Sequence, residues 1–354
     1  MNDAMKTKAA VLCQVNEPLR IEELHLPELK PGQVLVKIAY SGICRSQFNE
    51  ISGLKGEDKY LPHTLGHEGS GVVEAVGAGV KKVKKGDRVV LTWIKSSGCD
   101  VMSARYERSD GSFVNSGAIS TFLTKAVISE NRLVKISDKM PLKEAALLGC
   151  AVPTGAGIVM NTLKVRSGDS IAVFGVGGIG LSALLAAKLK KINTVIAVDI
   201  VDSKLNFATE LGATHIVNAK KQNALKEILQ TTDMNGVDYA IECAGKKESM
   251  ETALKSVRDN GGICIIAGNL PKEETISIDP FDLIKGKRII GTWGGETNPD
   301  RDIALYADLF LADKLKLSKL ITREYELEKI NSAFNELSQE KTGRILIRNV
   351  VKEC

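Results

Sequence analysis

Between residues 170 and 293 the sequence alternates short apolar runs with longer segments of helical composition, and this rhythm constrains the fold more than any other feature. The run Ser170–Phe174 is apolar and bounded by glycine, Gly178–Lys190 has helical composition, and Thr194–Ile200 is again apolar. Such alternation is typical of parallel strands joined by covering helices. We therefore predict an α/β fold with a doubly wound parallel sheet. The alternation continues through Ser203–Leu211, His215–Val217, Asn223–Leu229, Val237–Cys243, Ser249–Val257, Ile263–Ala267 and Ile289–Trp293.

The first ninety or so residues are instead β-rich, with glycine and proline between short strand-like segments. Closely spaced strands and turns predict a compact barrel or folded sheet. After Trp293 two helical segments, at 302–312 and 327–337, precede an alternating strand at 343–349. That strand needs a sheet to join, and the N-terminal β region is the available one. We therefore expect a discontinuous first domain interrupted by the α/β region. The N-terminal strand-like segments are Ala9–Cys13, Val34–Tyr40, Gly71–Val76 and Arg88–Leu91.

Composition excludes several classes of protein. A length of 354 residues favours two domains, and 44% hydrophobic with 26% charged residues argues against disordered, collagen-like and disulfide-scaffold chains. The net charge of +5 is spread along the chain, so we expect no nucleic-acid partner, and no apolar run is long enough to predict a membrane span. Because Met1–Thr7 is polar and lacks the apolar core of a signal peptide, we expect a cytoplasmic protein. The seven cysteines are then packing residues or metal ligands rather than disulfides.

The segment Gly175-Val176-Gly177-Gly178-Ile179-Gly180 matches the glycine pattern of dinucleotide-binding turns. A strand precedes it, a helix follows it, and Asp199 ends the next strand 19 residues after Gly180. Gly175 permits the tight turn, Gly177 lets the backbone approach a pyrophosphate, and Gly180 lets helix and strand pack closely. Asp199 is placed to accept hydrogen bonds from a ribose and to repel a 2′-phosphate, which favours NAD over NADP. Lys204 either reaches the same ribose or is an ordinary surface lysine.

Three residues offer soft or borderline metal ligands. His67 lies in Gly66-His67-Glu68, Cys44 lies 23 residues earlier, and Cys150 lies 83 residues later. Two thiolates and an imidazole would leave one tetrahedral position open, as a catalytic zinc requires. The spacing alone leaves open that either cysteine is simply a small buried hydrophobe.

Taken together, these motifs resemble the medium-chain zinc-dependent alcohol dehydrogenase family, over essentially the whole chain. The resemblance implies a GroES-like, β-rich catalytic domain made of residues 1–152 and 295–354, with an NAD-binding Rossmann domain at 153–294 and the active site in the cleft. The motifs, in family order, are Gly42-Ile43-Cys44-Arg45-Ser46, Gly66-His67-Glu68, Lys85-Gly86-Asp87-Arg88-Val89, Gly149-Cys150 with Thr154-Gly155, Gly175–Gly180 with Asp199, and Gly343-Arg344.

The resemblance also implies roles for individual residues in the metal site. Cys44, His67 and Cys150 match the three ligands of a catalytic zinc. Glu68 matches the acidic residue behind the metal, and Ser46 matches the hydroxyl that hydrogen-bonds the bound alcohol.

Three further residues match cofactor contacts of the family. Arg45 and Arg344 match contacts to the pyrophosphate of the cofactor. Thr154 matches a residue that lies against the nicotinamide.

The chain departs from the family at several positions. Residues 92–122 contain only Cys99, whereas many relatives have four cysteines there that hold a structural zinc, so we predict one zinc per chain. Gln47 replaces the aspartate that usually orients the zinc-binding histidine, which predicts a weaker support for His67. Asn49 replaces a histidine that ends the proton relay in some relatives. The proton then leaves through Ser46, the cofactor ribose and water, or through another group such as His63.

Two tryptophans suggest an apolar pocket wall. Trp93 matches a position that lines the substrate pocket in relatives, and Trp293 lies near the expected nicotinamide. Packing in the core explains a tryptophan equally well. Tyr106, in the segment that lacks the cysteines, is expected at the surface.

The leading interpretation is an NAD-dependent zinc alcohol dehydrogenase that acts on a small alcohol or its aldehyde or ketone. One alternative is a dehydrogenase of a hydroxyl on a sugar or other polar metabolite. A distant alternative is a non-catalytic NAD-binding protein, which the presence of all three zinc ligands argues against. We expect a homo-oligomer, either a dimer or a tetramer.

Overall fold

The computed structural model describes residues 6–117, 119–339 and 343–349 and divides the chain into two compact units. The first unit extends to Cys150 and resumes with Asn298–Gln339 and the last strand, and the second contains Ala151–Thr297. Part of the predicted polar N-terminus, Met1–Met5, lies outside the described residues.

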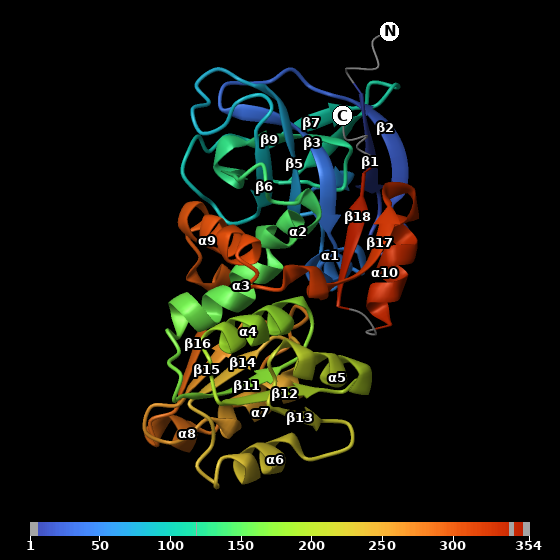
Figure 1. Cartoon of the computed structure of the whole chain (residues 1–354). Helices are drawn as coiled ribbons and strands as arrows, with labels where there is room; N and C mark the ends of the chain where they lie inside the picture. Colours follow the sequence, from blue (N-terminus) through green and yellow to red (C-terminus); the bar gives the residue numbers. More distant parts are fainter. Residues whose placement is uncertain (1–5, 118, 340–342, 350–354) are drawn as a thin grey trace. The chain divides into compact units, whose positions relative to one another are not determined.

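The first unit contains a closed barrel and a larger sheet (Figure 1). The barrel strands, in order, are β1 (Lys6–Leu12), β2 (Arg20–His25), β7 (Arg105–Glu107), β8 (Phe113–Ser116) and β4 (His63–Thr64). The sheet strands, in order, are β10 (Leu133–Lys135), β6 (Arg88–Thr92), β5 (Glu68–Val76), β3 (Gln33–Gly42), β18 (Arg344–Arg348) and β17 (Ile321–Glu326), with β9 (Lys125–Ser129) also paired to β3. The helices are α1 (Arg45–Ile51), α2 (Leu142–Ala145), α9 (Pro299–Leu311) and α10 (Ile330–Ser338).

The prediction that the last strand joins the N-terminal β region is confirmed. Strand β18 pairs antiparallel with β3, and Leu346 lies opposite Gly42 (Figure 1). On its other side β18 pairs in parallel with β17. Residues about 300 positions apart in the sequence therefore share one sheet and one hydrophobic core, in which Ile345 and Ile347 pack with Phe122 and Phe334.

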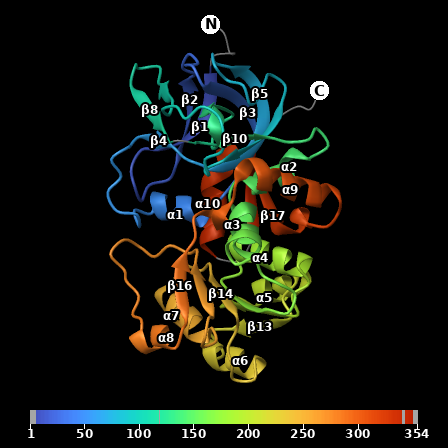
Figure 2. The ribbon, with the colours of Figure 1, turned by 90° about the vertical axis from the view of Figure 1, so that its left-hand side faces the viewer.

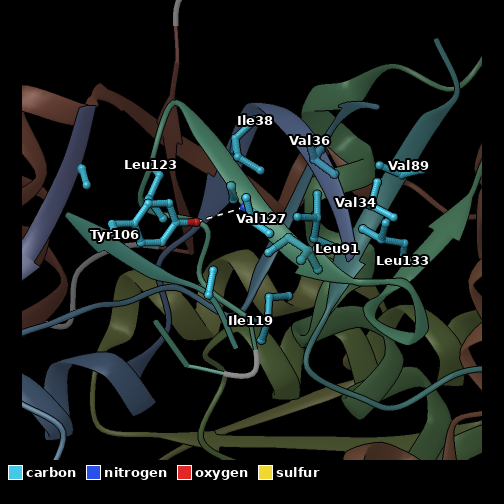
Figure 3. Packing of buried hydrophobic residues seen from close by; sticks show 14 of the residues in the cluster. Val34, Val36, Ile38, Val89, Leu91, Tyr106, Ile119, Leu123, Val127 and Leu133 are labelled. Atoms are coloured by element: carbon cyan, nitrogen blue, oxygen red, sulfur yellow. Dashed lines mark hydrogen bonds between the residues drawn. The ribbon is translucent and has the colours of Figure 1, made fainter. Parts of the chain in front are cut away.

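The core of the β region contains alternating apolar residues of β3 and β6, together with apolar residues of β9 (Figure 3). Tyr106 lies inside this core and is fully buried, so the expectation that it lies at the surface is wrong. Its hydroxyl oxygen accepts a hydrogen bond from the Val127 backbone N–H at 3.0 Å (Figure 3). Burial raises the pKa of Tyr106 to about 12. A three-residue strand such as β7 is too short for its alternation to show which side chain points inward.

The second unit is a six-stranded parallel sheet between helices (Figure 1). Its strands, in order, are β13 (His215–Asn218), β12 (Thr194–Asp199), β11 (Ser170–Phe174), β14 (Tyr239–Glu242), β15 (Ile263–Ile266) and β16 (Arg288–Gly291). Its α-helices are α3 (Ala151–Gly157), α4 (Gly178–Leu189), α5 (Asp202–Leu211), α6 (Ala224–Thr231), α7 (Lys247–Ser256) and α8 (Pro280–Ile284). Helices α4 and α5 pack on one another over one face, and α6 and α7 do so over the other (Figure 1). The strand order reverses direction between β11 and β14, where parallel sheets of this kind bind ligands.

No single helix among the described residues is long and apolar enough to cross a membrane. One bent pair, Leu142–Gly149 with Ala151–Thr162, passes that test by length and composition alone.

Candidate metal centre and cofactor site

Four potential metal ligands converge in the first unit. Cys44 precedes α1 as its N-cap residue, His67 lies between β4 and β5, Glu68 begins β5, and Cys150 follows a short 3₁₀ helix. One ligand atom from each of the four lies within 4.8 Å of the others. His67 Nε2 is 3.2 Å from Cys150 Sγ. The structure therefore brings together residues that lie more than 100 positions apart in the sequence.

Two glycines make this convergence possible. A Cβ atom on Gly42 would lie 2.5 Å from the Glu68 side chain. A Cβ atom on Gly149 would lie 2.3 Å from the Leu91 carbonyl oxygen and 2.8 Å from Glu68 Cα. Any larger residue at either position would displace Glu68, so the glycines beside Cys44 and Cys150 are part of the site's construction.

The charges of the site are balanced by buried partners. Arg344 Nη2 forms an ion pair with Glu68 Oε1, and both side chains are almost completely buried. The pKa of the Cys44 thiol lies well below its ordinary value because of its hydrogen bond with Cys150, with further contributions from His67 and the charge of Arg344. Arg344, which the family resemblance predicts as a pyrophosphate contact, is thus placed beside the metal ligands in this structure.

The donor set fits zinc. Zinc in proteins is held by thiolates, imidazoles and carboxylates in tetrahedral geometry, and catalytic sites keep one position for water or substrate. Cys44, His67 and Cys150 supply three such donors, and Glu68 supplies a carboxylate close enough to approach the same ion. The fully buried Glu68 carboxylate would be costly without a cation nearby, and Arg344 provides one.

Helix α1 carries the other predicted residues of this unit. Ser46 and Arg45 occupy its first turn and are both half-buried. The guanidinium of Arg45 lies 5.2 Å from the centre of the Phe48 ring. Gln47 is buried, its Oε1 accepts a hydrogen bond from the Cys44 N–H at 3.1 Å, and its Nε2 contacts His67 Nδ1.

A cavity of about 400 Å³ adjoins His67. At its edge the buried His63 directs Nδ1 toward the Thr64 carbonyl oxygen at 3.1 Å and Nε2 toward Asp58 Oδ2 at 2.8 Å. Glu50 Oε1 lies 3.8 Å from the same Nε2. The residues that line the cavity are mainly polar: Gln47, Glu50, Tyr60, His63, Thr64, Leu65, Gly66, His67, Ser103, Asn115, Ser116, Gly117 and Ile119.

The predicted cofactor residues form a separate group in the second unit. Gly175 has φ of +85°, and a Cβ atom there would lie 2.7 Å from the Ala244 nitrogen. A Cβ on Gly180 would lie 2.1 Å from the Gly175 carbonyl oxygen, whereas one on Gly177 would meet nothing within 4 Å. The first and third glycines are thus needed for packing, and the second leaves open space at the start of α4, where N–H groups are free to bind a phosphate.

Asp199 ends β12 and connects that strand to the glycine-rich turn. Its carboxylate accepts hydrogen bonds from the N–H groups of Val176 at 2.9 Å, Ile200 at 2.8 Å and Val201 at 3.1 Å. Lys204 is half-buried in the first turn of α5. Thr154, in α3, is buried with 6% exposure.

The two tryptophans differ in their surroundings. Trp93 is partly buried and packs against the core of the β region. This agrees with the alternative that core packing, rather than a pocket wall, explains this tryptophan. Trp293 is 76% exposed.

Some residues with notable contacts in the first unit give no signal in the sequence. Glu50 and Asp58 are ordinary acidic residues of a polar segment, and only the fold directs them toward His63. Glu130 is equally inconspicuous, yet it is buried and accepts backbone hydrogen bonds from Lys81, Lys82 and Cys99. This carboxylate links the backbone around Lys81 and Lys82 to the backbone at Cys99.

Comparison with known proteins agrees with this geometry. The alcohol dehydrogenase GroES-like domain family matches residues 30–138, and the zinc-binding dehydrogenase family matches residues 178–311. The chain is 34% identical over 368 residues to an S-(hydroxymethyl)glutathione dehydrogenase of Photobacterium damsela, covering 97% of this chain and 100% of that protein.

Solved structures show the same similarity. Benzyl alcohol dehydrogenase from Acinetobacter calcoaceticus is 31% identical with a TM-score of 0.89, covering 98% of this chain and 99% of that one. An alcohol dehydrogenase zinc-binding domain protein from Burkholderia ambifaria is 31% identical with a TM-score of 0.91 and the same coverage. The chain belongs to the medium-chain zinc-dependent alcohol dehydrogenase family.

Proposed function

We propose that this protein oxidises an alcohol to an aldehyde or ketone, or catalyses the reverse reaction, with zinc and NAD. The observation that carries the proposal is the convergence of Cys44, His67, Glu68 and Cys150 within 4.8 Å. Similarity to a benzyl alcohol dehydrogenase and an S-(hydroxymethyl)glutathione dehydrogenase supports the same class of reaction.

Zinc at such a site supplies Lewis acidity, which lowers the pKa of an oxygen bound to it, and NAD supplies the hydride acceptor. The chain's own residues handle the proton. Ser46 lies two residues after Cys44, and its hydroxyl can accept the alcohol proton and donate its own toward solvent. The Glu68–Arg344 pair keeps the buried charge near neutral, and the capped helix α1 holds Cys44 and Ser46 in fixed register.

A polar alcohol, such as a sugar derivative or other hydroxylated metabolite, is the second candidate for the substrate. The cavity beside His67 favours it, because most of the residues that line this space are polar, among them Glu50, Ser103 and Ser116, and a hydroxylated substrate can form hydrogen bonds with such groups. An apolar substrate would instead prefer a wall of hydrophobic side chains.

For the cofactor we propose NAD rather than NADP. A 2′-phosphate would meet the Asp199 carboxylate at the end of β12. The carboxylate has three backbone donors already, so its position is fixed before the cofactor binds.

We also propose that the protein forms a homodimer through the β16 edge of its parallel sheet. Strand β16 is the last in the sheet order, with α8 beside it (Figure 2). Apolar side chains are concentrated in these two elements, with Ile284 76%, Phe281 57%, Leu283 45% and Ile290 42% exposed. Exposed apolar patches at an open sheet edge are typical of association sites.

A cytoplasmic location is likewise proposed. The six cysteines in the described part of the chain form no disulfide with one another, which agrees with a reducing compartment.

A substrate panel tests the proposed function. The measurement is NADH formation with simple alcohols, polyols and sugar derivatives, made on a sample whose zinc content is known. Ser46→Ala should lower kcat by about 100-fold or more while leaving the zinc content unchanged, because it removes only the proton acceptor. A zinc-loaded protein that oxidises no alcohol, or a Ser46→Ala variant with unchanged kcat, would contradict the proposal.

A further inference from the structure

The Gln47 side chain serves two neighbours at once. It is the third residue of α1, and its Oε1 accepts a hydrogen bond from the backbone N–H of Cys44, the N-cap residue, at 3.1 Å. This is one half of a capping box. The other end of the same carboxamide, Nε2, contacts His67 Nδ1. Gln47 is 2% exposed, so water does not substitute for either partner.

The chemistry of these partners fixes the position of the imidazole proton. A backbone N–H can only donate, so the amide atom that faces Cys44 must be the oxygen. The amide NH₂ therefore donates to His67 Nδ1, which must be unprotonated. A neutral imidazole then carries its proton on Nε2. That nitrogen lies 3.2 Å from Cys150 Sγ, where it can donate to the sulfur.

Metal binding requires the opposite arrangement. The His67 nitrogen that belongs to the ligand cluster is the one near Cys150, and to bind a metal it must give up its proton. The proton of the neutral ring then moves to Nδ1, which faces the Gln47 NH₂, so two donors oppose each other. Turning the amide over restores a bond to Nδ1 but presents NH₂ to the Cys44 N–H and breaks the helix cap.

We propose that Gln47 is a positioning residue that makes the zinc of this enzyme weakly held and readily exchanged. The proposal rests on the zinc site of the proposed function. One amide oxygen cannot serve both the helix cap and a metal-bound histidine. The zinc-bound state therefore loses one buried hydrogen bond that the metal-free state keeps. A carboxylate at this position would have an acceptor oxygen for each partner.

Gln47→Glu tests this inference in the full-length protein. Glutamate has the same reach and retains the capping-box bond at the third helix position. We expect the Kd for zinc to fall about 10- to 100-fold, the usual effect of partners behind a metal-bound histidine. The Kd is measured by competition with a chromophoric chelator at one pH, and the rate of zinc release to excess chelator should fall in parallel. Gain of affinity is a result that a merely structural role would not produce.

Asn49→Asp is the matched control. It adds the same charge two residues later on α1, where the structure shows no contact with His67 among the described residues. Its zinc Kd should change by less than about threefold. An unchanged Kd in Gln47→Glu, or equal tightening in Asn49→Asp, would overturn the proposal. Failure of all three proteins to bind zinc would instead contradict the proposed function.

A second measurement needs no variant at position 47. In zinc-free wild-type protein labelled with ¹⁵N-histidine, the His67 ring should show the Nε2–H tautomer. The His67 signals are identified by their loss in His67→Gln. A neutral ring with its proton on Nδ1 would overturn the proposal even if Gln47→Glu failed to fold.

Discussion

Asp199 is the residue on which the choice of cofactor depends. Asp199→Asn removes the charge that opposes a 2′-phosphate, while the remaining side-chain oxygen can still accept backbone hydrogen bonds. We expect the ratio of the Kd values for NADPH and NADH to fall by about tenfold, equivalent to about 1.4 kcal/mol. The measurement is a fluorescence titration with each reduced cofactor.

The exposed Asp202, in the first turn of α5, provides the control. Asp202→Asn makes the same change of charge and should leave the ratio unchanged. Wild-type protein that binds NADPH more tightly, or an Asp199→Asn variant with the wild-type ratio, would refute this role for Asp199.

At the scale of single residues, the sequence predicts which residues could bind zinc, but it does not predict which buried residues surround them. Cys44, His67 and Cys150 have no regular spacing, and their grouping is predictable only from the accompanying motifs. The ion pair of Arg344 with Glu68 joins β18 to β5, strands that are not even neighbours in their sheet. No local pattern encodes such a pair, because it depends on the final packing of both strands.

At the scale of elements, the buried Glu130 side chain joins the segment before β6 to the segment after it. Its carboxylate accepts hydrogen bonds from the Lys81 and Lys82 N–H groups at 2.6 Å and from the Cys99 N–H at 2.8 Å. Burial raises the pKa of the Glu130 carboxyl, but these bonds outweigh it and hold the pKa below its ordinary value. Glu130→Gln turns one acceptor into a donor and should lower the free energy of unfolding by about 1–3 kcal/mol.

The pH dependence has a definite sign. Because the pKa is lower in the folded state, the stabilisation is complete above the unfolded-state value of about 4.3 and is lost as the pH falls through the folded-state pKa. The difference between wild type and Glu130→Gln in urea unfolding should therefore be large at neutral pH and shrink in acid. Glu107→Gln, on an exposed residue of β7, is the control and should have no effect. A difference that grows in acid would contradict this account.

The sequence predicts best those helices and strands whose apolar residues form a clear run or period. Strand β11 occupies the predicted residues Ser170–Phe174 because its apolar run is bounded by turn-forming glycines. Strands β4, β7 and β8 have two to four residues each, too few to show a period of two, and they form only because the barrel pairs them. The sequence does not predict helix α1, because seven residues are too few to show a helical period, although Phe48 and Ile51 pack against the core and Gln47 caps the start of the helix.

At the scale of the whole molecule, the proposed homodimer depends on one sheet edge. Ile284→Asp places a charge on the exposed apolar patch of α8 and should convert a dimer to monomer in sedimentation velocity experiments. Ile216→Asp is the control, because Ile216 is 39% exposed on β13, the opposite edge of the same sheet. Dissociation by Ile216→Asp alone, or a monomeric wild-type protein, would contradict the proposed interface.

The zinc content of the purified protein, by elemental analysis, is the most direct test of the account. Because three ligands converge in the first unit and residues 92–122 contain a single cysteine, wild type should hold about one zinc per chain. Cys150→Ala should hold almost none while its circular dichroism stays that of a folded protein. Two tightly held zinc ions in wild type, or an undiminished zinc content in Cys150→Ala, would contradict it.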